Sequence, residues 1–306
     1  MPNVRLTDRA LILVAGEDAE HFLQNILTTD LSSLGDDEAR PGALLTPQGK
    51  ILFDFLISKS PGGYRLDCRR DVATDFARRL TLYKLRAKVT IVVEDQALVA
   101  ANWEADSVSS GIDSTTSRFD STASHPESTL RDARFPIDAG ISRVYGAAAR
   151  PDNGSAGGVA AWNALRVAHG IAESGSDYML GDAFPHDVLL DQTGGVGFRK
   201  GCYVGQEVVS RMQHRGTARR RVLIASADAP LPAPGTPVEA GGRPLGALGT
   251  VSGTKALAVV RIDRVKEAMD AGQPIAADGV ALTLSIPAWA GFTFPEAPAE
   301  SAAGEA

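Results

Sequence analysis

The sequence predicts an α+β protein of two or three domains that ends in a small β-barrel. Three observations support this fold class. The chain has 306 residues, which is more than one hydrophobic core usually serves. Its first hundred residues mix strand patterns with helix patterns. After Arg221 only short strand patterns follow, separated by Gly and Pro turns, as is typical of a small barrel.

The first elements are a buried strand and a short helix. Residues 11–14 form an unbroken apolar run that Gly16 ends. Asp18 is then expected to be the N-cap of a helix. The apolar face of that helix carries Phe22, Leu23, Ile26 and Leu27.

A small α+β unit is expected next. Residues 43–45 and 51–57 read as two strands joined by a Pro-Gln-Gly-Lys turn. The following patterns are a strand at 64–68, a helix at 72–85 and a strand at 89–93. Strands that flank a helix in this order favour an α+β sandwich, and Cys68, inside its strand, is expected to be structural.

The middle and end of the chain contain loops, one helix and the barrel strands. Residues 105–130 are rich in Ser, Thr and Asp and predict a flexible loop or a degenerate piece of the fold. The other expected segments are a connection at 154–158, a helix at 160–170, a loop at 181–197, strands at 222–225, 245–251, 257–262 and 280–286, and a disordered tail at 294–306.

Composition excludes several classes of protein. A net charge of -6 argues against general nucleic-acid binding, which depends on neutralising phosphate. Cys68 and Cys202 are too few for a disulfide framework or a four-thiolate cluster. Residues 1–9 have no apolar core for a signal peptide or membrane segment. No metal site is expected, since His186 has no partner at metal-ligand spacing. We therefore expect a soluble cytoplasmic protein without membrane contact.

Residues 199–207 contain the highest concentration of candidate functional residues in the chain. Cys202 lies between Gly201 and Gly205, with Arg199 and Lys200 just before it. Residues 206–213 have the spacing of a short helix, whose N-terminus would favour a thiolate or a bound anion. The alternative is an ordinary turn in which Cys202 is a small buried hydrophobe. On the first interpretation, we expect Cys202 to be partly exposed, to have a depressed pKa, and to react faster than Cys68 with an alkylating agent at pH 7.

This stretch carries a resemblance to a known family. The sequence KGCYVGQE at 200–207, with the arginines behind it, resembles the signature of the YgfZ-type folate-binding family. Members of this family are relatives of the glycine-cleavage aminomethyltransferase and assist iron-sulfur proteins. A second likeness, Phe-Leu-Gln at 22–24 followed by Thr28 and Asp30, matches a family element near the N-terminus. Without the resemblance, residues 28–30 would be an ordinary helix stop.

The resemblance implies an aminomethyltransferase-like fold. The domains it implies are a discontinuous folate-binding domain (1–42 with 101–219), a ferredoxin-like α+β domain (43–100), a C-terminal β-barrel (220–290) and a flexible tail (291–306). Residues 131–145, which include Asp132, Arg134 and Arg143, resemble the element that returns the chain to the first domain.

The resemblance also implies a ligand and its contacts. Tetrahydrofolate or a derivative would lie near Trp162, where the family has a ligand-binding tryptophan; the alternative is that Trp162 is a core aromatic. Two positions depart from the relatives, Ala168 in place of a pterin-contacting glutamate and Arg9 in place of a tryptophan. The implied folate-contacting residues are Gln24, Thr28, Asp30, Asp54, Trp162, Arg166, Lys200, Gly201, Tyr203, Gly205, Gln206, Glu207 and Arg211, and Cys202 is the candidate functional thiol.

Three candidate functions stay open, and the resemblance implies the first two. The first is a folate-binding accessory protein for assembly or repair of 4Fe-4S enzymes, whose partners are iron-sulfur client enzymes or assembly factors. The second is a folate-dependent one-carbon transferase. Its relatives carry two adjacent acidic residues where this chain has Phe53-Asp54, so Asp54 would act alone. The third is a module that only docks a partner through the Cys202 face.

Overall fold

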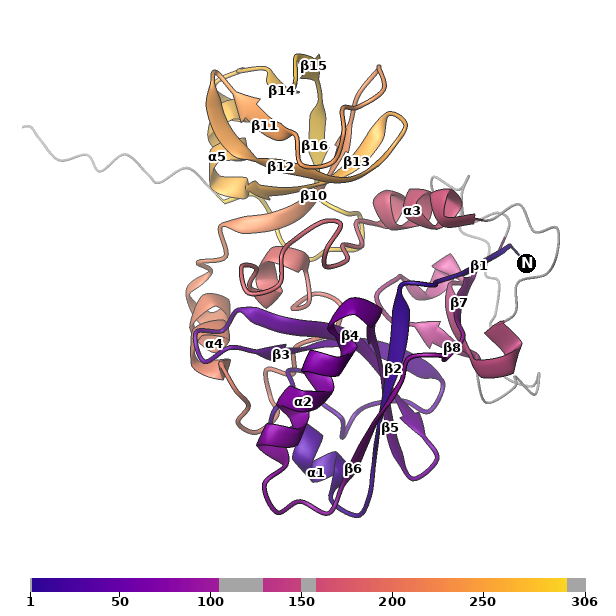
Figure 1. The fold of residues 1–306 in the computed structure, drawn as a ribbon. Helices are drawn as coiled ribbons and strands as arrows, with labels where there is room; N and C mark the ends of the chain where they lie inside the picture. Colours follow the sequence, from indigo (N-terminus) through magenta and orange to yellow (C-terminus); the bar gives the residue numbers. More distant parts are fainter. Residues whose placement is uncertain (1, 105–128, 150–157, 296–306) are drawn as a thin grey trace, which may run out of the picture.

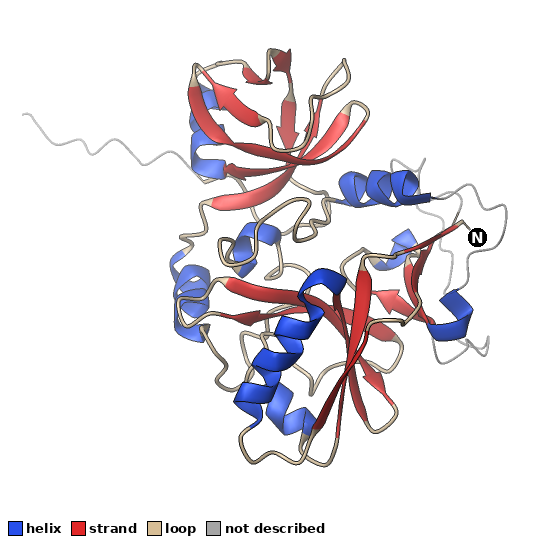
Figure 2. Ribbon diagram, in the orientation of Figure 1, coloured by secondary structure: helices blue, strands red, loops and turns tan. Residues whose placement is uncertain are grey.

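The computed structural model describes residues 2–104, 129–149 and 158–295. Within them the chain forms a large mixed sheet with helices on its faces and a separate barrel-like sheet beyond it (Figures 1 and 2). The expected α+β architecture with a C-terminal barrel is therefore confirmed.

The large sheet joins the N-terminal hundred residues to the segment after 128. Its nine strands are antiparallel neighbours except for the parallel pair β3 and β8. In spatial order they are β1 (Asn3–Arg5), β7 (Val99–Asn102), β9 (Ser142–Tyr145), β8 (Thr129–Asp132), β3 (Glu38–Leu45), β4 (Ile51–Ser60), β5 (Gly63–Arg69), β2 (Arg9–Ala15) and β6 (Thr90–Glu94). This one sheet runs through both units that the sequence divides near residue 42.

Two helices cover one face of strands β2, β4 and β5 (Figure 1). They are α1 (Ala19–Gln24) and α2 (Ala73–Lys84). Phe76 of α2 stacks on Phe53 and Phe55 of β4, with ring centroids 4.8 and 5.5 Å apart. Cys68 lies in the same core with no exposed surface, as expected of a structural cysteine.

Asp18 is the N-cap residue of α1, as predicted, but its side chain makes no capping hydrogen bond. Its carboxylate accepts a hydrogen bond from the backbone N–H of Lys88 at 2.7 Å instead. A tertiary partner has taken the oxygen that local capping would use, because the chain before β6 passes beside the helix start.

A third helix, α3 (Gly158–His169), connects the two sheets. It contacts β1 on one side and the barrel strands β12 and β13 on the other (Figure 1). The short helices η1 (Arg70–Val72), η3 (Ile137–Ala139) and η4 (Gly146–Ala149) turn the chain at the ends of strands. The buried face of α3 packs Trp162 and Leu165 into a core that includes Trp103 and Phe135.

The C-terminal barrel has seven strands and one helix in the described part of the chain. Its spatial order is β15 (Val280–Ala281), β14 (Ile275–Ala277), β11 (Pro237–Ala240), β12 (Arg243–Ser252), β13 (Lys255–Arg261), β10 (Arg220–Ser226) and β16 (Thr283–Ser285). Helix α5 (Ile262–Asp270), which the sequence analysis did not predict, follows β13 directly and buries Ile262, Val265 and Ala268 against the barrel core.

Two segments connect the sheets around the candidate site. One runs from α3 through η5 (Pro185–Val188) to α4 (Gln206–Arg215) and enters β10. The other, residues 286–295, returns from the barrel. The indole N–H of Trp289 donates to the His169 carbonyl at 2.7 Å, and Phe292 lies beneath the Arg221 guanidinium, 4.8 Å from ring centroid to carbon.

Some expected segments lie partly outside the described residues. These are the polar loop predicted at 105–130, apart from its last two residues in β8, the connection at 154–158, apart from Gly158 in α3, and the tail from 296 onward.

Candidate functional site

A small central cavity lies where β4, the loop after α3 and the returning C-terminal segment meet. Its volume is about 30 Å³, and its wall includes Asp54, Arg134, Glu173, Tyr178 and Trp289. The Asp54 carboxylate accepts hydrogen bonds from the Ser174 hydroxyl at 2.6 Å and the Tyr178 hydroxyl at 2.9 Å. Burial, with the Asp54 charge beside it, raises the pKa of Tyr178 well above its ordinary value, so this phenol stays a hydrogen-bond donor.

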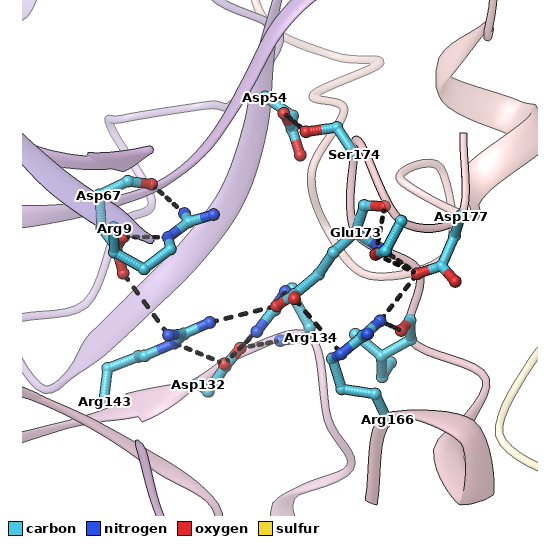
Figure 3. A network of polar contacts seen from close by, with 12 residues as sticks. Arg9, Asp54, Asp67, Asp132, Arg134, Arg143, Arg166, Glu173, Ser174 and Asp177 are labelled. Atoms are coloured by element: carbon cyan, nitrogen blue, oxygen red, sulfur yellow. Dashed lines mark hydrogen bonds and ion pairs between the residues drawn. The ribbon is translucent and has the colours of Figure 1, made fainter. Parts of the chain in front are cut away.

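The cavity borders a buried set of ion pairs, which we call the arginine network (Figure 3). Its members are Arg9, Asp67, Asp132, Arg134, Arg143, Arg166, Glu173 and Asp177. The set holds four cations and four anions, so its formal charges cancel. It ties strands β2, β5, β8 and β9 to the loop after α3.

Close contacts hold the network together. Arg9 Nε lies 2.6 Å from Asp67 Oδ1, and Arg134 Nη2 lies 2.7 Å from Asp132 Oδ2. Glu173 receives Arg134 Nη1 at 3.0 Å. Burial raises the pKa of Glu173, but Arg166, Arg134, Arg143 and Arg9 outweigh it and hold that pKa well below its usual range. The carboxylates are therefore ionised, and the network behaves as a compensated interior.

The network extends to the barrel through a second cluster of contacts. Arg166 Nη1 donates to Asp177 Oδ2 at 2.7 Å, and Arg166 Nη2 donates to the Thr250 hydroxyl of β12 at 2.9 Å. Asp177 Oδ1 accepts the Thr250 backbone N–H at 2.6 Å. Arg166, implied by the resemblance to contact folate, thus holds α3 against the barrel.

The central cavity does not fit a folate in the described conformation. Small-molecule sites are usually about 300–1,000 Å³, against about 30 Å³ here. Trp162 is buried in the core beside Phe135 and is not among the residues of the cavity wall. Its ring lies 5.1 Å from the Arg143 guanidinium carbon, while its indole N–H has no hydrogen-bond partner within the described chain.

The two stretches that carry the resemblance meet in space. Lys200 is buried and its Nζ donates to the carbonyls of Leu27 at 2.7 Å and Thr29 at 2.8 Å, just after α1. The Thr28 hydroxyl donates to the Gly195 carbonyl at 2.7 Å and accepts the Ala43 N–H at 2.9 Å. Burial lowers the pKa of Lys200 to about 8, against the opposing charge of Asp30.

Gln24 and Asp30 stabilise the turn after α1 that contacts Lys200. Gln24 Nε2 donates to Asp30 Oδ1 at 2.8 Å, and Gln24 Oε1 accepts the Leu31 backbone N–H at 2.8 Å. The hydrogen bonds of both side chains are therefore to other parts of the chain, and they fix the carbonyls that receive Lys200.

Cys202 is exposed on the loop that Lys200 anchors. Tyr203 packs into a core cluster, and its backbone N–H donates to Gln206 Oε1 at 3.3 Å. Gly205 has a φ of +78°, and a Cβ there would lie 2.5 Å from the Thr46 carbonyl, so only glycine fits. Gly201 has no atom within 4 Å of such a Cβ and is not required in this way. The loop is thus a fixed platform that presents one thiol.

The predicted site residues therefore fall into three places. Asp54, Trp162 and Arg166 lie at or near the central cavity, and Gln24, Thr28, Asp30 and Lys200 form a structural joint. Gly201, Cys202, Tyr203, Gly205, Gln206, Glu207 and Arg211 form the Cys202 loop and the start of α4. Glu207 and Arg211 pair with each other on the exposed side of α4.

Sequence reasoning missed Glu173, Ser174, Tyr178 and Asp67. Their partners are distant in sequence: Arg134 is 39 residues from Glu173, and Asp54 is 124 residues from Tyr178. The available signal was weak, a polar run after α3 that also suits an exposed turn.

Two further searches cover only residues 2–104, 129–149 and 158–295. No helix there is long and apolar enough to cross a membrane. No three His, Cys, Asp or Glu side chains there are grouped to hold a metal ion.

Comparisons with known proteins extend these findings. Residues 219–292 match the family model described as "CAF17, C-terminal beta-barrel domain". A crystal structure of the glycine cleavage system aminomethyltransferase T from Bartonella henselae has a TM-score of 0.70 at 16% identity and covers 94% of this chain and 85% of its own. This likeness shows the fold alone.

Several proteins with assigned names are similar to this chain in sequence as well. The chain is 33% identical over 71% of its length to "Iron-sulfur cluster assembly factor IBA57 homolog, mitochondrial" of Chaetomium globosum, and spans 54% of that protein. It is 29% identical to the IBA57 factors of Mus musculus and Homo sapiens, covering 93% of this chain and 84% of each. The chain thus spans about half the length of the fungal relatives and most of the mammalian ones.

The prediction of a cytoplasmic protein is wrong by these comparisons, because the fungal, mouse and human relatives are all named as mitochondrial. It rested on the absence of a disulfide framework, which indicates a reducing environment and does not distinguish the cytoplasm from other reducing compartments.

Proposed function

We propose that this chain is an accessory factor of the YgfZ type that supports the assembly or repair of iron-sulfur enzymes, those with 4Fe-4S clusters in particular. The names of its relatives support the general role. The observation that carries it is the exposed Cys202 on a fixed loop, while Cys68 is fully buried. Its partners would be iron-sulfur client enzymes or other assembly factors.

The geometry explains how one thiol acts as an accessory rather than as a complete scaffold. Iron-sulfur clusters are usually held by four cysteine thiolates, and Cys202 supplies one. A partner must therefore supply the remaining ligands. Lys200, Tyr203 and Gly205 hold the backbone on both sides of the thiol, so a partner meets it without ordering the loop first.

The same geometry gives less support to the transferase alternative. Of the two carboxylates in the cavity wall, Glu173 is paired with arginines, and the Ser174 and Tyr178 hydroxyls already bind the oxygens of Asp54. The cavity beside it has room for a water molecule or two rather than for a one-carbon donor.

Tetrahydrofolate, or a derivative, is proposed as a ligand only of an opened form of the central cavity. Its wall offers the apolar surfaces of Phe55, Leu56 and Trp289 beside the charges of Arg134 and Glu173. Since a pterin does not fit in the described conformation, no chemical step is assigned to it.

Tryptophan fluorescence tests whether folate enters the central cavity. Tetrahydrofolate should change the emission of wild type and of Trp162→Phe, and it should change the emission of Trp289→Phe less. No change in wild type would remove folate from the proposal.

Complementation tests the function itself. In a strain that lacks the protein, 4Fe-4S enzyme activity is measured after return of wild type, Cys202→Ala, Cys202→Ser or Asp54→Asn, with protein abundance checked. We expect both Cys202 variants to fail and Asp54→Asn to succeed. Full rescue by Cys202→Ala would overturn the proposed thiol role, and failure of Asp54→Asn alone would favour the transferase.

A further inference from the structure

A second cavity lies on the other side of the connecting segment, between α4, the start of β10, α5 and residues 291–295. We call it the barrel-side cavity. Its volume is about 410 Å³, within the range of small-molecule sites. Its wall includes His186, Arg219, Arg221, Phe292, Met212 and Ile262. It shares no wall residue with the central cavity.

Arg221 is a largely buried cation with unused donors. Its side chain is 8% exposed, and Nη1 donates to Asp191 Oδ1 at 2.6 Å and to the His186 carbonyl at 2.9 Å. Its Nε has no hydrogen-bond partner within the described chain. An arginine N–H left without a partner in the interior costs free energy unless a ligand or water meets it.

His186 supplies a second unpartnered atom in the same wall. The residue is 1% exposed, and its Nε2 shares a hydrogen bond with Gln213 Oε1 at 3.1 Å. Its Nδ1 has no partner among the described residues. His186 and Arg221 come from different segments and both line the cavity, but these two atoms have no accessible surface. The donor of Arg221 that a ligand can meet is Nη2, which makes no hydrogen bond within the described chain and is not fully buried.

The cavity wall also holds one cation without a partner. Arg219 lies at its wall, and its guanidinium makes no hydrogen bond or ion pair with the described part of the chain. The two carboxylates of the wall are already paired, Asp191 with Arg221 and Asp263 with Arg261 Nε at 2.9 Å. An anion entering the cavity would meet Arg219 without competing against a free carboxylate.

Apolar surface lines the rest of the cavity. Phe292 lies 4.8 Å from the Arg221 guanidinium carbon, and Met212, Ile262 and Pro295 stand around it. A fully hydrated inorganic ion would leave this surface uncovered, whereas a ligand with an organic body would bury it.

We propose that the barrel-side cavity binds a small organic anion, with its carboxylate or phosphate held by Arg219 and Nη2 of Arg221 and its apolar body against Phe292. Guanidinium groups suit both kinds of anion because their planar N–H groups match the oxygens of either. The His186 side chain completes the polar wall. The inference stands on the cavity alone and does not depend on the proposed iron-sulfur role.

Calorimetric titration of the full chain at constant ionic strength tests it with four probes. Benzoate and phenyl phosphate carry a ring and an anion, benzamide carries the ring without charge, and inorganic phosphate carries charge without a ring. We expect saturable 1:1 binding of benzoate or phenyl phosphate, at least tenfold tighter than benzamide or inorganic phosphate. The tighter of the two aromatic anions identifies the class of anion.

Two variants locate the binding. Arg219→Gln should weaken the aromatic anion at least tenfold. Arg243→Gln, which removes the same charge from an exposed barrel side chain outside the cavity wall, should change it less than twofold. The proposal is overturned if neither aromatic anion saturates, if benzamide binds as tightly, or if the two variants weaken binding equally.

Discussion

The central cavity and the barrel-side cavity both contain buried arginines, and they differ in what those arginines face. Around the central cavity, Arg134 and Arg143 lie against Asp132 and Glu173, and about 30 Å³ remains. Around the barrel-side cavity, Arg221 is paired with Asp191, Arg219 has no partner within the described chain, and about 410 Å³ is open. Interior charge that is matched within the chain stabilises one arrangement, while charge left unmatched beside open space is available to a ligand.

The largest effect is expected in the alkylation rates of the two cysteines, because Cys68 lies in the closed core and Cys202 on the exposed loop. Iodoacetamide at pH 7 should modify Cys202 at least about a thousandfold faster than Cys68, since a core residue reacts only after opening of the fold. Burial also raises the pKa of Cys68 to about 12, which disfavours its reactive thiolate. Mass spectrometry of the two cysteine peptides against time measures the ratio.

A Cys202→Ser protein isolates the slow reaction of Cys68. Equal rates for the two thiols would mean that the exposed position of Cys202 or the closed core around Cys68 is wrongly placed.

The second prediction compares a carboxylate of the arginine network with one in the wall of the barrel-side cavity. Asp132→Ala should lower the free energy of unfolding by about 3–5 kcal/mol, because it leaves Arg134 and Arg143 buried without that anion. Asp191→Ala should cost only about 1–2 kcal/mol, since water in the barrel-side cavity can reach Arg221. Urea denaturation measures both, and Asp36→Ala, whose side chain is 87% exposed, serves as the surface control.

A loss for Asp191→Ala as large as that for Asp132→Ala would remove the distinction between the two cavities, since it would place Arg221 in an interior as dry as the arginine network.

The third prediction concerns acid. The pKa of Glu173 is raised by burial and lowered further by its arginines, so its folded value lies below the unfolded one. Its stabilisation is therefore present above about pH 4.3 and lost as pH falls below that value. Wild type should lose about 2 kcal/mol more than Glu173→Gln between pH 6 and pH 3, the usual contribution of one salt-bridged carboxylate. Parallel stability profiles for the two proteins would contradict this.

The smallest effect is expected at Arg219. Because its guanidinium has no partner in the described structure, Arg219→Gln should change the free energy of unfolding by less than about 0.5 kcal/mol. A loss above about 1 kcal/mol in urea denaturation would show that Arg219 is part of the fold rather than free for a ligand.

Periodicity predicted the strands and helices whose apolar faces are regular. The strand at 11–14 and the helices at 72–85 and 206–213 were found within a few residues of their true bounds. Helix α5 was missed because Ile262, its first residue, also extends the apolar run of β13. Strand β11 has only four residues, too few for alternation to be distinctive.

The candidate site was predictable only in part. The motif around Cys202 was visible, and its exposure agrees with the first of the two interpretations. The arginine network was not visible, since Asp67 occupies a strand between Leu66 and Cys68, all three of them buried. A charged residue in a strand is expected to face water, and only the tertiary pairing with Arg9, 58 residues away, reverses that expectation.

The returning segment at 286–295 contributes to the wall of both cavities. Trp289 belongs to the wall of the central cavity and Phe292 to that of the barrel-side cavity, and both follow the last barrel strand. During synthesis from the N-terminus, the strands of both sheets and α3 are made before these two residues. Neither cavity has its full wall until Trp289 and Phe292 are in place, so the shape of both cavities depends on one short segment.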